Sequence, residues 1–126
     1  MAVTYTTAVK NARLNAVTTA IGTTGVLEIG TSAMGTVLAT IPLANPAAPA
    51  AASGVLTFTM PRSDTSADAT GTAAAARIRT ATGGTDIVTG LTVTLTGGGG
   101  DIQLDSLSIT SGQTVTLNTA TITHAA

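Results

Sequence analysis

Residues 91–96 read LTVTLT, the most regular stretch of the chain, in which apolar side chains alternate strictly with threonines. Alternation with a period of two places every second side chain on the same face of a strand. Threonine is β-branched and favours extended backbone, so the polar positions support the same conformation. The stretch therefore predicts a half-buried β-strand whose leucine and valine side chains enter a core while its threonines face solvent.

The same alternation recurs along most of the chain after Gly22, and turn-forming residues separate the segments. Near Asp105 the apolar residues change from even to odd positions, which indicates a β-bulge or the meeting of two strands. A second slip of this alternation occurs around 118–120. We expect seven or eight short strands forming an antiparallel β-sandwich or jelly roll in a mostly β protein. Alternating or apolar segments lie at 27–29, 37–43, 56–60, 91–96, 102–104, 107–109 and 115–122, and around Ile78.

Residues 7–21 predict the one α-helix of the chain, because their apolar positions recur at helical spacing. Thr6 or Thr7 can cap its start, and Gly22 suits the turn that ends it. The apolar face is predicted to contain Leu14, Val17 and Ile21, extended by Val9, Ala12, Ala16 and Ala20.

The length of the chain fits a single domain, residues 1–126, with no internal repeat. Residues 1–22 form the helical N-terminal segment and 23–126 the β region. Within the β region, the Pro/Ala-rich stretch 42–53 is expected to be a loop or an extended arm, since its prolines disrupt both helix and central strand. Residues 61–72 are expected to form a second, polar loop.

Charge is scarce in this chain. Charged residues make up 9% of it, against about 25% in ordinary soluble domains, and the formal net charge is −1. Such a chain lacks the positive field that binding to a phosphate backbone needs, so nucleic acid is not an expected partner. A neutral, hydroxyl-rich surface also does little to keep copies apart, which favours a defined homo-oligomer.

The chain contains no cysteine, which excludes disulfides and thiolate metal sites. Its opening residues, MAVTYTT, do not resemble a secretory signal, and no run approaches the roughly 18–20 apolar residues of a membrane helix. We therefore expect a protein made in the cytoplasm without its own export signal and without a membrane partner.

Catalysis needs convergent ionisable side chains, and the sequence offers few. His124 is the only histidine, lies close to the C-terminus of this sequence, and would have to be the base of any serine triad. No G-x-S-x-G motif is present. We expect no enzyme activity, no cofactor and no bound metal.

Two pairs of aspartates deserve comparison with known ion sites. Asp64 and Asp68 share a loop, and Asp101 and Asp105 share the start of a strand. Their spacing does not match an EF-hand, so capping of turns is the favoured role, with Ca²⁺ binding at Asp64 and Asp68 as the alternative. The four glycines at 97–100 lack the lysine and Ser/Thr of a phosphate-binding loop and predict a flexible hairpin turn.

Arg77 and Arg79 fall on one face of a strand, where they would pair with acidic residues of the same chain or form salt bridges to another subunit. Aromatic residues number only two, which disfavours a sugar-binding surface built on exposed rings. Tyr5 precedes the helix and is placed to anchor the N-terminal segment on a neighbour. The residues predicted to form an intersubunit interface are Tyr5, Leu14, Val17, Arg77 and Arg79.

Several stretches together resemble small virion structural proteins of tailed bacteriophages, and the resemblance extends over nearly the whole chain. They are MAVTYTTAVKNARLNAVTTAIG, LEIGTSAMGTVLATIPL, SDTSADATGTAAAARIR, GTDIVTGLTV and SGQTVTLNTATITHA. The most similar type is the capsid decoration, or cement, protein, which implies a β-sandwich or jelly roll seated as trimers on the capsid. The resemblance transfers no functional residue to a position of this sequence.

The resemblance implies a virion location on the capsid surface, with the major capsid protein as partner and a homotrimer as the working unit. We expect the N-terminal segment 1–21 or the stretch 42–53 to make contacts between subunits. The alternative is a tail-fibre or adhesin domain that recognises a host surface.

Overall fold

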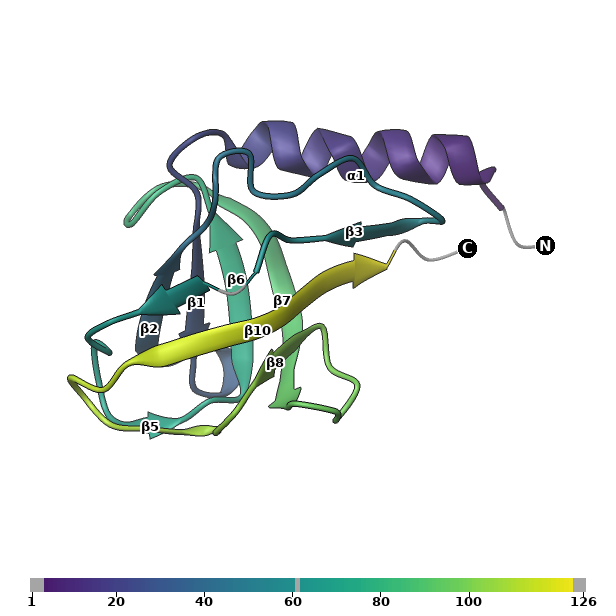
Figure 1. The fold of residues 1–126 in the computed structure, drawn as a ribbon. Helices are drawn as coiled ribbons and strands as arrows, with labels where there is room; N and C mark the ends of the chain where they lie inside the picture. Colours follow the sequence, from purple (N-terminus) through teal and green to yellow (C-terminus); the bar gives the residue numbers. More distant parts are fainter. Residues whose placement is uncertain (1–3, 61, 124–126) are drawn as a thin grey trace.

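The computed structural model describes residues 4–60 and 62–123, in which strands clearly dominate (Figure 1). Strand accounts for 41% and helix for 15% of the structure, which confirms a mostly β protein with one α-helix. The strands form a single curled sheet of eight strands and a separate two-stranded ribbon, and α1 lies across one end of the curled sheet.

Helix α1, Thr7–Ile21, has the predicted bounds. The Thr6 hydroxyl caps its first turn by accepting a hydrogen bond from the Val9 N–H at 3.3 Å. Gly22 ends the helix with φ +75°, a backbone conformation that glycine adopts without strain. Local sequence signals therefore determine both ends of this helix.

The buried face of α1 is narrower than predicted. Leu14 and Ile21 are buried and Val17 packs partly against the core, but Val9 is 43% exposed. The extension of the apolar face to Val9, Ala12, Ala16 and Ala20 was wrong, because all four side chains are exposed. The reason is the placement of α1, which crosses one end of the sheet and presents only one narrow side to it (Figure 1).

The curled sheet has the strand order β2-β1-β6-β7-β8-β10-β3, and β4 also pairs with β10. Strands β5 and β9 form the separate ribbon. A short 3₁₀ turn, η1 (Ser32–Met34), joins β1 to β2. The strand bounds are β1 Val26–Gly30, β2 Val37–Pro42, β3 Val55–Thr57, β4 Arg62–Asp64, β5 Gly71–Thr72, β6 Ala75–Arg79, β7 Asp86–Leu95, β8 Ile102–Leu104, β9 Ser108–Ile109 and β10 Val115–Thr123.

The core fills the inside of the curl. Alternate residues of most strands point inward, as the period-two pattern predicted, and Thr92 and Thr94 lie on the opposite face from the buried Leu91 and Val93. The prediction was wrong for Leu95, whose side chain is 49% exposed at the end of β7. The largest fully buried side chains come from α1, β1, β2, β3, β6, β8, β9 and β10: Ile21, Leu27, Ile29, Leu38, Ile41, Leu56, Ile78, Ile102, Leu104, Ile109 and Leu117.

Strands β2 and β4 lie at edges of the curled sheet that face each other. Side-chain hydrogen bonds join them, in place of the backbone ladder that joins paired strands. The Asp64 carboxylate accepts a hydrogen bond from the Thr40 N–H at 3.0 Å. The Arg62 Nε donates to the Pro42 carbonyl at 2.8 Å. The Asp68 carboxylate accepts from the Thr40 hydroxyl at 2.8 Å. We call this contact the seam, and it brings the sheet round on itself.

Strands β7 and β8 pair in parallel, with Val93 opposite Ile102 and Leu95 opposite Leu104. The predicted hairpin turn at 97–100 was therefore wrong. Parallel neighbours normally need a long crossover, whereas here the chain turns back within a few residues. The glycines permit this, because Gly97 and Gly99 have positive φ, while a Cβ on Gly98 or Gly100 would lie 2.8 Å from Thr94 side-chain atoms.

The Pro/Ala-rich stretch 42–53 is a loop folded onto the body, not a projecting arm. Ala47, Ala48 and Ala51 are buried, and the Ala47 carbonyl accepts a hydrogen bond from the Thr59 N–H at 3.0 Å. The small alanine side chains let this loop lie close to α1 and cover the end of the core.

Two other predictions from the pattern have clear outcomes. Residues 61–72 are more than a loop, because their described part contains β4 and β5. The slip near Asp105 is the junction of β8 and β9, and the slip around 118–120 is a register shift between Leu117 and Thr119 in the pairing of β10 with β8.

Candidate functional site

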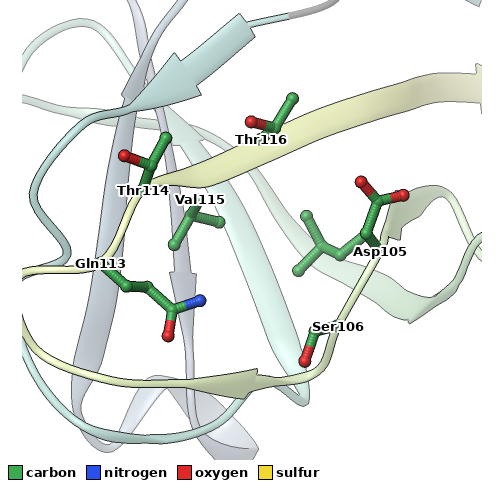
Figure 2. A pocket seen from close by; sticks show the side chains of 7 residues that line it. Asp105, Ser106, Gln113, Thr114, Val115 and Thr116 are labelled. Atoms are coloured by element: carbon green, nitrogen blue, oxygen red, sulfur yellow. The ribbon is translucent and has the colours of Figure 1, made fainter.

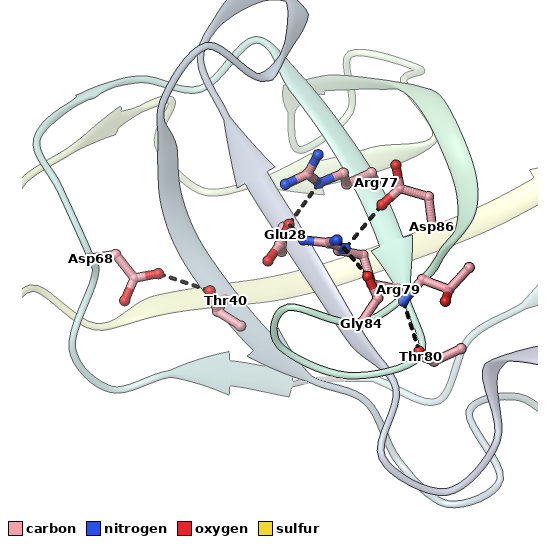
Figure 3. A network of polar contacts seen from close by, with 9 residues as sticks. Glu28, Thr40, Asp68, Arg77, Arg79, Thr80, Gly84 and Asp86 are labelled. Carbon is pink, nitrogen blue, oxygen red and sulfur yellow. Dashed lines mark hydrogen bonds and ion pairs between the residues drawn. The ribbon is translucent and has the colours of Figure 1, made fainter.

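A charged cluster covers the outer face of β1 and β6 (Figure 3). Glu28 on β1 lies opposite Arg77 on β6, and the Arg77 Nε is 2.6 Å from Glu28 Oε1. Arg79 Nη1 lies 3.7 Å from the same oxygen. Arg79 Nε lies 2.9 Å from Asp86 Oδ1, an ion pair without a directed hydrogen bond at that nitrogen. Two arginines and two carboxylates thus neutralise one another.

The burial of Glu28 makes this cluster structural. Glu28 is 4% exposed, whereas the side chains of Arg77 and Arg79 keep about a fifth of their surface exposed. A buried carboxylate needs partners of opposite charge, because burying it unpaired would cost far more than the pair contributes. Of the two roles predicted for the arginines, the structure shows the pairing inside the chain, and a contact to another subunit stays a prediction.

The carboxylates of Asp64 and Asp68 act on the chain around them. Asp64 Oδ1 accepts a hydrogen bond from the Ser66 N–H at 3.0 Å, which confirms the predicted turn-capping role for Asp64. Through Thr40, both carboxylates also bind the neighbouring strand across the seam. In the described ranges no three His, Cys, Asp or Glu residues lie close enough to hold a metal ion.

Asp101 and Asp105 hold the two ends of β8. Asp101 Oδ2 accepts hydrogen bonds from the N–H and the hydroxyl of Thr92, at 3.1 and 3.0 Å. Asp105 Oδ1 accepts from Asn118 Nδ2 at 2.6 Å and from the Thr96 hydroxyl at 3.3 Å. Both aspartates therefore bind other strands, a wider role than capping of their own turns.

A polar hollow of about 110 Å³ lies where β8 and the start of β10 diverge (Figure 2). Asp105 and Ser106 flank it on one side, and Gln113 and Thr114 on the other. Gln113 Oε1 accepts a hydrogen bond from the Thr110 N–H at 2.7 Å, which fixes that side chain. The complete lining is Leu104, Asp105, Ser106, Gln113, Thr114, Val115 and Thr116. The hollow is far smaller than the roughly 300–1,000 Å³ of a typical ligand pocket, so it has room for the end of one side chain.

The predicted interface residues of the N-terminal segment differ in their positions. Tyr5 is 41% exposed, and its ring lies beneath the Arg13 guanidinium, whose central carbon is 4.7 Å from the ring centroid. Leu14 is 3% exposed and belongs to the core of its own subunit, while Val17 packs partly against that core. Tyr5 is thus the member of this group with a large exposed surface. His124, the only candidate base, lies outside the described residues.

Sequence reasoning missed two asparagines that attach the loop 42–53 and its continuation to α1. Asn15 Oδ1 accepts a hydrogen bond from the Ala51 N–H at 2.8 Å. Asn11 Oδ1 accepts from the Gly54 N–H at 3.0 Å. The signal that could have revealed them is their spacing, because residues four apart lie on one side of a helix. That spacing says nothing, however, about which distant segment they meet.

Comparison with known protein families, with curated proteins and with solved structures finds no match to this chain. The described residues include no helix with the length and apolarity needed to cross a membrane.

Proposed function

We propose that this protein is a non-catalytic structural subunit that attaches to the outside of a tailed-phage capsid and stabilises it. In this role the chain works as an oligomer, and the trimer that the resemblance implies is the expected form. The partner is the major capsid protein, which the subunit contacts in the assembled shell.

One observation carries the proposal: the carboxylates of this chain form interactions within the fold itself. The chain has six acidic residues, and all six accept hydrogen bonds or form ion pairs within the chain. They join strands or hold turns, as a rigid scaffold requires. The carboxylates of the chain are therefore engaged in maintaining the fold.

The surface that results suits attachment to a large shell. The exposed positions of β7 include Thr89 and Thr92, so the surface along this strand is polar and carries few charges. Attachment through such a surface depends little on salt, because screening acts on charges. Several weak contacts made by one oligomer add up to strong avidity.

The test is co-sedimentation of the purified protein with capsids of the phage that encodes it, prepared without this protein. The proposal expects saturable binding to assembled capsids, little binding to the unassembled capsid protein, and a higher temperature of capsid disruption, since a ligand specific to the shell stabilises it by mass action. Binding to host cells or glycans, with none to capsids, would support the adhesin alternative instead.

A further inference from the structure

The hollow beside Asp105 has the chemistry of a site for a cationic side chain. Asp105 Oδ1 is held by Asn118 and Thr96, while Oδ2 has no hydrogen bond or ion pair within the described ranges. Asp105 is exposed at the edge of the hollow, with Ser106 on the same side and Thr114 on the opposite side. A carboxylate fixed through one oxygen offers the other to a donor at little entropic cost.

The chain also has basic side chains that form no ion pair with a carboxylate. Of its five basic residues, three arginines bind acceptors within the fold. Lys10 and Arg13, both on α1, form no ion pair in the described structure. Arg13 is exposed, and the Tyr5 ring below its guanidinium holds it in place. Lys10 is half-buried, with its side-chain carbons close to Gly54.

Arg13 is the better match to the hollow for a chemical reason. A guanidinium is planar and presents several N–H donors in a fixed arrangement, which suits a carboxylate with a free oxygen and polar groups across a small hollow. The first turns of α1, Thr7–Arg13, contain no fully buried residue. The Gly54 segment lies against Lys10 and Asn11 on one side of this end, and Arg13 is exposed.

We infer that Arg13 of one copy binds the hollow beside Asp105 of a second copy, an inference that rests on the proposed oligomeric role. A contact within one chain does not fit the fold, since α1 lies at one end of the curled sheet and the β8–β9 connection lies toward the other (Figure 1). The chain thus carries two complementary features at opposite ends. Such a head-to-tail contact closes into a ring when the rotation between copies permits, and a trimer is the smallest ring beyond a pair.

The experiment measures the mass of the full-length protein by light scattering after size exclusion, over a series of concentrations. Arg13→Glu and Asp105→Arg should each weaken self-association by about 10- to 100-fold, as expected for a close charge pair between subunits. The double variant carries both reversed charges in one chain and should recover most of the association. Asp105→Asn keeps an oxygen that can accept the hydrogen bond from Asn118. It therefore measures the effect of the negative charge on self-association without removing that hydrogen bond.

Two matched variants distinguish a specific contact from general electrostatics. Lys10→Glu makes the same change of charge one turn away on α1. Asp68→Arg reverses another exposed aspartate that, like Asp105, binds a threonine hydroxyl. Both should leave self-association within about threefold of the wild type, as charges at the rim contribute little. Circular dichroism and thermal melting establish that each variant is folded before its mass is interpreted.

Three results would overturn the inference: a wild-type protein that stays monomeric at the highest attainable concentration, a double variant as weak as the single ones, or Lys10→Glu as damaging as Arg13→Glu. Co-sedimentation with capsids, performed on the same samples, separates this outcome from failure of the proposed function. If the wild type binds capsids while Arg13→Glu leaves its mass unchanged, the function stands and the contact between copies does not. If Arg13→Glu loses capsid binding alone, Arg13 contacts the capsid instead.

Discussion

The side chain of Thr94 occupies the space that a Cβ on Gly100 would need. Its Cγ2 atom lies 2.8 Å from the position of such a Cβ, and its hydroxyl accepts a hydrogen bond from the Gly100 N–H at 3.0 Å. The return of the chain from β7 to β8 therefore depends on the absence of a side chain at this position.

Gly100→Ala should lower the free energy of unfolding by about 2 kcal/mol, because the added methyl group overpacks a closed contact. In a Thr94→Ala background the same substitution should cost about 1 kcal/mol less, since the obstructing atoms are gone. Urea unfolding of the four proteins gives this coupling. Gly99→Ala is the control: its φ of +85° makes alanine strained whatever the space, so its cost should not depend on Thr94.

Glu28→Ala should be among the most destabilising single substitutions on the outer face. It leaves Arg77 and Arg79 without their shared carboxylate and opens space beside β1. Loss of one partner of a buried pair costs about 3–5 kcal/mol, and the partial exposure of the arginines reduces this to about 2–4 kcal/mol. Asp86→Asn removes an ion pair whose carboxylate side chain is 43% exposed, and it should cost less than about 1 kcal/mol. Equal effects in thermal unfolding would contradict the structural role of Glu28.

Asn15→Ala should loosen the loop 42–53 from α1. The substitution leaves the Ala51 N–H without its acceptor, at a cost of about 1–2 kcal/mol. Hydrogen exchange at the Ala51 amide should become faster, while exchange in β1 remains slow. Asn15→Asp retains an oxygen acceptor and should keep the Ala51 amide protected. Fast exchange in both variants would show that the side-chain contact is not what holds the loop.

The two faces of α1 should respond differently to truncation. Leu14→Ala removes a side chain that is 3% exposed and should cost about 2–4 kcal/mol through the cavity it leaves. Val9→Ala alters a side chain that is 43% exposed and should change the free energy of unfolding by less than about 0.5 kcal/mol. These values apply to the folded subunit, measured at a concentration where it is monomeric. A large cost for Val9→Ala under that condition would place Val9 in the core.

Local signals in the sequence predicted a good part of this fold. Thr6 and Gly22 end the helix as expected, and alternation located the strands that carry Leu27, Leu56 and Leu91. Both slips in phase correspond to real breaks in pairing. These features depend on interactions between residues that are close together in the sequence.

The missed features depend on which distant segments meet. The short strand β4 was hidden in a polar segment because Arg62 and Asp64 use their side chains to reach β2. The outer residues of α1 could not be told from the inner ones, because Ala12 and Ala16 fit either environment. The hollow beside Asp105 arises only where β8 and β10 diverge, and no local pattern indicates that place.

The seam between β2 and β4 also affects how the molecule behaves in a crowded solution. An unpaired strand edge is a template on which another chain can add a strand, and this is how folded β proteins begin to form fibres. Here the Asp64 carboxylate accepts a hydrogen bond from the Thr40 N–H, and the Arg62 side chain donates one to the Pro42 carbonyl. These two backbone groups on the β2 edge are therefore not available to pair with a strand from another chain. At the far end of the strand order, β3 lies in contact with α1. Uncontrolled strand addition at the β2 edge is thereby discouraged by the same few side chains that close the fold.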